Sequence, residues 1–173
     1  MMKMKNAIMM MGLSVAFMGC SNQPELSKSD AKLLVAKLWK SDTLATDLNM
    51  TDRDKVNTPA IKDLEAKQLL TVTRKWTIAD GGAETMALTD AARKYDLPGD
   101  TRYPFIKRLF VAIRDIEIKD IKYRERENDQ IASIAYRLSY KDVSPFVVLD
   151  GGLNPVDKSA EFRYNGAEWV PVE

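Results

Sequence analysis

The sequence predicts an α+β fold, in which a helical N-terminal part with a β-hairpin precedes an antiparallel sheet of four or five strands. Three observations carry this prediction. Apolar residues recur at helical spacing in the stretch 29–68. Apolar and polar residues alternate strictly over 132–140, and Asn165-Gly166 separates two β-rich runs near the C-terminus. The length of 173 residues fits one domain of ordinary size.

Two helices are predicted in the N-terminal part. Ser27 or Ser29 can cap a helix that begins near Asp30, because a serine hydroxyl can accept a hydrogen bond from a free backbone N–H of the first turn. Thr58-Pro59 supplies a cap and a first-turn proline for a second helix, which runs to about Gln68. Between them lies a mixed, polar stretch with room for one short helix.

A β-hairpin is predicted after the second helix. Residues 69–78 are rich in β-forming side chains, 79–82 contain two glycines, and 84–88 form the returning strand. A last short helix is expected over 90–95. The whole helical part with its hairpin covers residues 29–97.

Two segments that flank this hairpin resemble the end of a MarR-type winged-helix domain. They are Leu64-Glu65-Ala66-Lys67-Gln68-Leu69-Leu70 and Leu88-Thr89-Asp90-Ala91-Ala92-Arg93. Gln68 and Ala92 stand where the family favours glycine. The resemblance, which covers residues 58–95, implies a winged-helix-like subdomain. It does not imply DNA binding, because a fold does not fix a function.

The C-terminal part, residues 103–173, reads as strands. Residues 109–121 are dense in isoleucine and predict one bent strand, or a helical turn followed by a strand. The alternation over 132–140 is the clearest strand signal, and the apolar run 145–149 predicts another strand. Asn165-Gly166 predicts a hairpin with a two-residue type I′ turn. Two prolines and a glycine within 97–104 mark the seam between the two parts.

Composition excludes several kinds of chemistry. The chain has no histidine and a single cysteine, which excludes Ser–His and Cys–His nucleophile pairs, zinc sites built from His and Cys, and disulfides within the chain. No cofactor is expected. The net charge is +1, and no run of like charges indicates a polybasic patch, so nucleic acid is not expected as a partner.

The N-terminal segment has the pattern of a secretory signal. Lys3 and Lys5 precede an uncharged stretch over 7–19, which is too short for a comfortable transmembrane helix. The run Phe17-Met18-Gly19-Cys20 resembles the bacterial lipobox, although Phe17 and Met18 are bulkier than is usual. The alternative is an ordinary secretory signal, or an anchor helix, with an incidental cysteine.

The lipobox resemblance implies a location and an anchor. Residues 1–19 would be cleaved between Gly19 and Cys20, and Cys20 would carry acyl chains that hold the protein on the bilayer. Residues 20–28 are short and polar and read as the tether. Ser21, rather than Asp, after the cysteine favours sorting to the periplasmic face of the outer membrane.

The sequence favours a non-catalytic binding or assembly module for a protein partner or an envelope component. A rim aromatic beside basic residues is a common partner anchor, so Arg74, Lys75 and Trp76 are the candidate contact residues. The alternative for Trp76 is packing onto the sheet.

Two other functions stay open. One is an immunity lipoprotein that neutralises a toxin in the periplasm. The other is a carboxylate-based envelope hydrolase, for which the candidate acids are Glu117, Asp120, Glu125 and Glu127. Interleaved arginines make a salt-bridged turn the simpler reading of the last two. The Ser29-x-x-Lys32 pattern lacks the partner motifs of penicillin-recognising enzymes, and a solvated loop is the simpler reading of Asp52 and Asp54.

Overall fold

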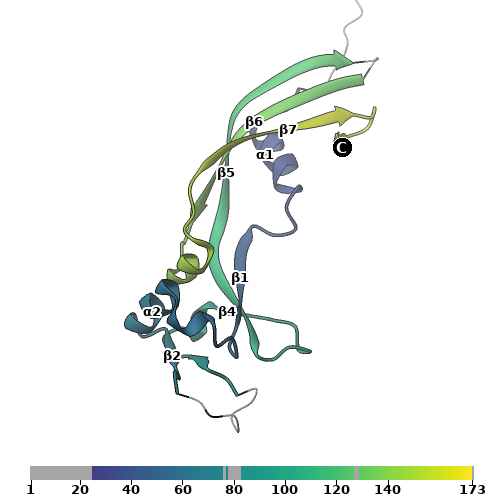
Figure 1. Ribbon diagram of the computed structural model, residues 1–173. Helices are drawn as coiled ribbons and strands as arrows, with labels where there is room; N and C mark the ends of the chain where they lie inside the picture. The colour runs from purple at the N-terminus through teal and green to yellow at the C-terminus, as the bar shows by residue number, and fades with distance from the viewer. Residues whose placement is uncertain (1–24, 76, 78–82, 127–128, 173) are drawn as a thin grey trace, which may run out of the picture.

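A strongly curled antiparallel sheet forms the frame of the molecule (Figure 1). The computed structural model describes residues 25–75, 77, 83–126 and 129–172. The strand order is β1-β5-β6-β7-β8, with the short β4 also paired to β5. The strands are β1 (Thr43–Asn49), β4 (Asp96–Leu97), β5 (Ile106–Arg126), β6 (Asp129–Lys141), β7 (Val156–Tyr164) and β8 (Trp169–Pro171).

Two α-helices form where their caps predict them. In α1 (Lys28–Ala36), the Ser27 hydroxyl accepts a hydrogen bond from the backbone N–H of Asp30. In α2 (Pro59–Ala66), the Thr58 hydroxyl accepts one from Ile61, and proline occupies the first turn. Both predicted helices are therefore confirmed. The described residues also form short 3₁₀ helices, among them η1 (Lys55–Asn57), η3 (Arg93–Tyr95) and η4 (Pro145–Asp150).

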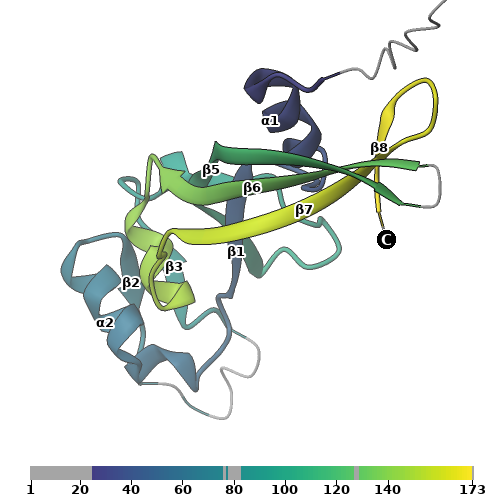
Figure 2. The ribbon, with the colours of Figure 1, turned by 90° about the horizontal axis from the view of Figure 1, so that it is seen from above.

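Two hydrophobic clusters stabilise different ends of the sheet. At one end, α1 packs Ala31 and Val35 against β5, β6 and β7, where Ile134 and Phe162 are buried. At the other end, α2, η4 and a separate two-stranded sheet surround Leu109 of β5. Seen from above, α1 and α2 lie on opposite sides of the strands (Figure 2). The long strand β5 takes part in both clusters.

The sheet draws strands from both predicted parts of the chain. The C-terminal part supplies β5 to β8, in agreement with the expected antiparallel sheet and the strict alternation that predicted β6. The stretch 42–57, expected to be irregular, contains β1, which pairs with β5 from Thr43 to Asn49. Because β1 and β4 also bond to β5, the sheet extends across the seam at 97–104.

Two local predictions in the C-terminal part were wrong. Residues 145–149 are not a strand but belong to η4, since the Ser144 hydroxyl accepts from the Phe146 N–H and Pro145 opens a helical turn. The β7–β8 hairpin is confirmed, but its turn is not type I′. Of its two turn residues only Gly166 has a positive φ, and the Asn165 side chain accepts from two backbone N–H groups further along the loop.

The helix and hairpin of the winged-helix resemblance are present, but the resemblance ends there. β2 (Leu70–Val72) and β3 (Met86–Leu88) pair after α2, while residues 90–95 form only turns and the short η3. The predicted turn over 79–82 lies outside the described residues. The coarse α+β class therefore holds, with the antiparallel sheet as its main component.

Candidate functional site

The loop between β4 and β5, residues 98–105, projects from the end of the molecule that carries α2 (Figure 1). Two consecutive turns shape it. The Tyr103 N–H donates to the Asp100 carbonyl at 3.0 Å, and the Ile106 N–H donates to the Tyr103 carbonyl at 2.9 Å. Pro104 suits the second position of the latter turn. The Met50 N–H donates to the Phe105 carbonyl at 2.8 Å and fastens the loop to the end of β1.

An ion pair holds the first of these turns. The Arg102 Nη2 and the Asp100 Oδ2 are 2.6 Å apart, and the Asp100 carboxylate also accepts the Arg102 backbone N–H at 3.0 Å. The hydrogen bonds from Arg102 lower the pKa of the Asp100 carboxyl below its ordinary value. The turn therefore keeps a fixed, ionised acid at neutral pH.

Two aromatic side chains project at the tip of this loop. Tyr103 is 49% exposed and Phe105 is 36% exposed. Their ring centroids are 6.3 Å apart in an edge-to-face arrangement, and the Arg102 guanidinium lies 5.8 Å from the Tyr103 centroid. Exposed aromatics beside an arginine are the residue types that contribute most energy to protein interfaces.

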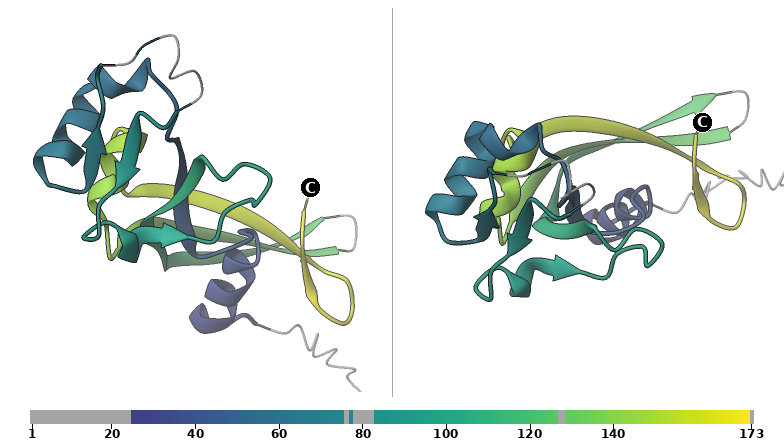
Figure 3. Two further views of the ribbon diagram at one scale, coloured as in Figure 1. Left: turned by 90° about the horizontal axis from the view of Figure 1, so that it is seen from below. Right: turned by 60° about the horizontal axis from the view of Figure 1, so that its bottom comes forward.

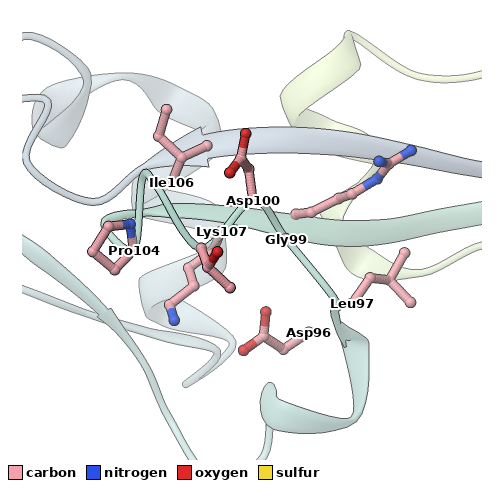
Figure 4. Close-up of a pocket in the computed structure, with 9 residues that line it drawn as sticks. Asp96, Leu97, Gly99, Asp100, Pro104, Ile106 and Lys107 are labelled. Atoms are coloured by element: carbon pink, nitrogen blue, oxygen red, sulfur yellow. The ribbon is translucent and has the colours of Figure 1, made fainter.

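Three hollows that share lining residues lie at the loop or beside it, and we call them together the loop groove. The first has a volume of about 330 Å³ and is lined by residues of β4, the loop and β5 (Figure 4). The second, also about 330 Å³, shares Asp96 and Lys107 with it and extends to β3. The third, about 220 Å³, shares Asp100 and Arg108 with the first and extends to Asp47 of β1. The first hollow therefore shares lining residues with each of the other two.

Charged side chains of both signs line the loop groove. Within the described part of the chain, Asp47, Asp96, Lys107 and Arg108 form no ion pair. Figure 4 shows the Asp96 carboxylate and the Lys107 amine reaching into the same hollow. Unpaired charges around an aromatic tip can give orientation and specificity to a polar partner surface.

Of the candidate contact residues Arg74, Lys75 and Trp76, the structure describes the first two. Arg74 is bound to Glu65 of α2 through two hydrogen bonds, of 2.9 Å from Nη1 and 2.5 Å from Nη2. It also donates to Asn57 and to the Val56 carbonyl, so it fastens the hairpin to α2. Lys75 is exposed, and Trp76 lies outside the described residues. Neither Arg74 nor Lys75 lines the loop groove.

The three described residues that were considered for catalysis, Glu117, Asp120 and Glu125, lie along β5. Glu117 pairs with Lys119 at 2.7 Å, and this contact lowers its pKa, while Asp120 lies 3.7 Å from Lys122. Glu125 is exposed on β5, and Glu127 lies outside the described residues.

The residues of two further sequence patterns, Ser29-x-x-Lys32 and Asp52-x-Asp54, make local contacts. Lys32 pairs with Asp115 at 3.3 Å, while Ser29 exchanges a hydrogen bond with Ser27. Asp52 accepts from the Asp54 N–H and lies 3.9 Å from Lys55. Among the described residues, no group of three or more Asp, Glu, His or Cys could hold a metal ion.

The loop groove was missed by sequence reasoning, because 97–104 was interpreted only as a seam. The available signal was the Tyr103-Pro104-Phe105 triplet in a turn-rich segment. Gly19 and Cys20, the expected cleavage and acylation residues, lie outside the described residues. In the part of the chain that is described, no helix has the length and hydropathy needed to span a bilayer. Comparisons with protein-family models, curated proteins and solved structures found no match.

Proposed function

We propose that this protein is a lipid-anchored, periplasm-facing binding module, which holds a protein partner through the loop groove and the Tyr103–Phe105 tip. The anchor is the acylated Cys20, and the membrane is the outer membrane of a bacterial envelope. The proposal assigns the protein no catalytic step.

The proposal is based on the observation that the N-terminal segment and the β4–β5 loop lie at opposite ends of the sheet. Leu26, six residues after Cys20, donates its backbone N–H to the Tyr123 hydroxyl near the outer end of β5. The loop between β4 and β5 lies at the opposite end of the sheet (Figure 1), and one hollow of the loop groove extends to β3. An anchor at one end and exposed aromatics at the other suit a protein that presents a docking surface away from the bilayer.

The anchor is tested first, through Cys20→Ser. We expect the unsubstituted protein to gain the mass of its acyl chains and to sediment with membranes, and Cys20→Ser to give an unprocessed or soluble form. Mass spectrometry of the purified chain and cell fractionation measure both. An unmodified Cys20 in the membrane-bound protein would overturn the anchor.

The docking surface is tested by photocrosslinking in living cells. A crosslinking amino acid at Tyr103 is compared with one at Val143, which is 50% exposed and lies outside the loop groove. We expect a defined protein adduct from position 103 alone. The adduct from position 103 should weaken when Asp96→Asn and Lys107→Met are combined, because both side chains reach into the groove.

Two other results of the crosslinking experiment would count against the proposed docking surface. Equal adducts from both positions, or an adduct that does not change with Asp96 and Lys107, would contradict a specific docking role for the groove. Because Asp96 is exposed, Lys107 is only partly buried and neither forms an ion pair within the described part of the chain, the free energy of unfolding of the combined variant should stay within about 1 kcal/mol of that of the unsubstituted protein. Denaturant unfolding checks that the loss of an adduct does not reflect misfolding.

A further inference from the structure

The outer surface of α1 carries large apolar side chains that the core does not use. Leu33 of α1 is 64% exposed, the highest value among the large hydrophobic residues that the structure describes, and Leu38, in the turn after the helix, is 41% exposed. On the inner side of the same helix Ala31 and Val35 are fully buried against the sheet. A helix that only covers a core shows polar residues on its solvent side, so the two leucines call for a separate explanation.

The charge on this helix is mainly positive. Residues 28–40 contain four lysines and one acid, Asp30, which accepts a hydrogen bond from the Ser27 hydroxyl. Lys32 pairs with Asp115, but Lys37 and Lys40 form no ion pair within the described ranges. The lysines are spaced three to five residues apart, so they form no basic run in the sequence. The helix brings Leu33 and Lys37 together as neighbours four residues apart.

The short chain before α1 limits how far this surface can lie from the proposed anchor. The cap residue Ser27 is the seventh residue after Cys20. Fully extended, they reach at most about 25 Å, and a flexible chain of that length spans roughly 15 Å on average. The high effective concentration of the bilayer means that weak contacts from α1 are sufficient to orient the protein.

We propose that the exposed surface of α1 and of the turn that follows it, with Leu33 on the helix and Lys37, Leu38 and Lys40 in the turn, lies against anionic phospholipid headgroups of the membrane that holds the anchor. This inference rests on the lipid anchoring proposed above. Lysine amines attract anionic headgroups, each by on the order of fivefold in affinity, and the leucines reach the boundary with the acyl chains. Surface helices that bind membranes combine the same two features.

The arrangement of the helices and strands agrees with a protein that turns α1 toward the bilayer. Seen from below, the strands lie between α1 and α2 (Figure 3, left), and the loop between β4 and β5 lies at the same end of the sheet as α2 (Figure 1). A bilayer against the outer surface of α1 therefore leaves the loop groove facing away from the membrane. The lipid contact would hold the docking surface in a defined direction, which a flexible tether alone does not do.

The experiment uses the mature lipoprotein in vesicles. Cys20 is the only cysteine, and its thiol is occupied by lipid after acylation, so Leu33→Cys introduces one unique labelling site. An environment-sensitive fluorophore at position 33 is compared with one at position 103, on the exposed loop. In vesicles of phosphatidylcholine and phosphatidylglycerol, we expect quenching by aqueous iodide to fall severalfold at position 33 relative to detergent micelles, with no change at position 103.

Two comparisons assign the effect to charge. In vesicles of phosphatidylcholine alone, and in the Lys37→Glu/Lys40→Glu variant, the label at position 33 should stay open to iodide. Full quenching at position 33 in anionic vesicles, by protein whose mass shows acylation, would overturn the lipid contact and leave the anchor standing. Equal protection in both vesicle types would overturn the anionic assignment. Protection in cells but not in vesicles would assign the surface to a protein instead, whereas absent acyl mass would refute the anchor itself.

Discussion

The backbone N–H of Leu26 donates a hydrogen bond of 2.7 Å to the hydroxyl of Tyr123, a residue 97 positions later in the chain. This contact fixes where the N-terminal segment leaves the sheet. The Tyr123 ring lies 6.2 Å from that of Trp169, so the hydroxyl is held by a packed aromatic pair. The position of Leu26, near the end of the expected tether, is therefore set by β5 as well as by α1.

The change Tyr123→Phe removes this hydrogen bond and keeps the ring. We expect the Leu26 amide to exchange its hydrogen faster by up to about tenfold, because a single hydrogen bond contributes about 0.5–1.5 kcal/mol. Hydrogen exchange followed by NMR measures the exchange rate of this amide. The matched control Tyr103→Phe should leave this amide unchanged. Unaltered exchange at Leu26 in Tyr123→Phe would contradict the role of the contact.

Gln68 ends α2 in a left-handed conformation, with φ +57°. The Leu69 N–H donates to the Leu64 carbonyl at 2.9 Å, as is typical where a helix ends in a left-handed residue. Since a side chain costs about 1 kcal/mol in this conformation, we expect Gln68→Gly to raise the free energy of unfolding by about that amount. Urea unfolding measures the change. Lys62→Gly, on the exposed face of α2, should instead lower stability by about 1 kcal/mol.

The sequence predicts a helix or strand correctly where the spacing of its apolar residues matches the side chains that are buried in the fold. β6 alternates because one of its faces is buried, whereas β1 has only Leu48 fully buried and shows no period. The apolar run that became η4 could not be distinguished from a strand by periodicity, and the decisive signal was the Ser144-Pro145 cap. The loop groove could not be foreseen, because it depends on how β1, β3 and the β4–β5 loop meet in space.

The Glu65–Arg74 contact predicts a pH dependence of stability. Hydrogen bonds from Arg74 lower the pKa of Glu65 below its ordinary value of 4.5. The folded state therefore favours the ionised acid, so this stabilisation is present above about pH 4.5 and is lost as the pH falls through the lower, folded-state pKa. We expect Glu65→Gln to reduce the thermal midpoint at pH 7 and to have progressively less effect at acid pH.

A double-mutant cycle tests the assignment of this pH dependence. In an Arg74→Met background, Glu65→Gln should lose most of its pH-dependent effect, because the partner that lowers the pKa is absent. Thermal unfolding of the four proteins at pH 7 and pH 3.5 gives the comparison. A pH dependence that persists without Arg74 would show that another group lowers the pKa of Glu65.

The two hydrophobic clusters lie at different ends of the sheet, yet we expect them to unfold together. Phe146 is fully buried in the cluster around α2, and its ring centroid lies 5.6 Å from that of Tyr95. Phe162 is buried in the cluster that α1 covers. Phe146→Ala and Phe162→Ala should each lower stability by about 3–5 kcal/mol. Because β5 packs into both clusters, each variant should still unfold in one transition. Calorimetry combined with circular dichroism measures this, with the exposed Leu33→Ala as a control within about 0.5 kcal/mol. Two separate transitions in either variant would show that the ends of the sheet fold independently.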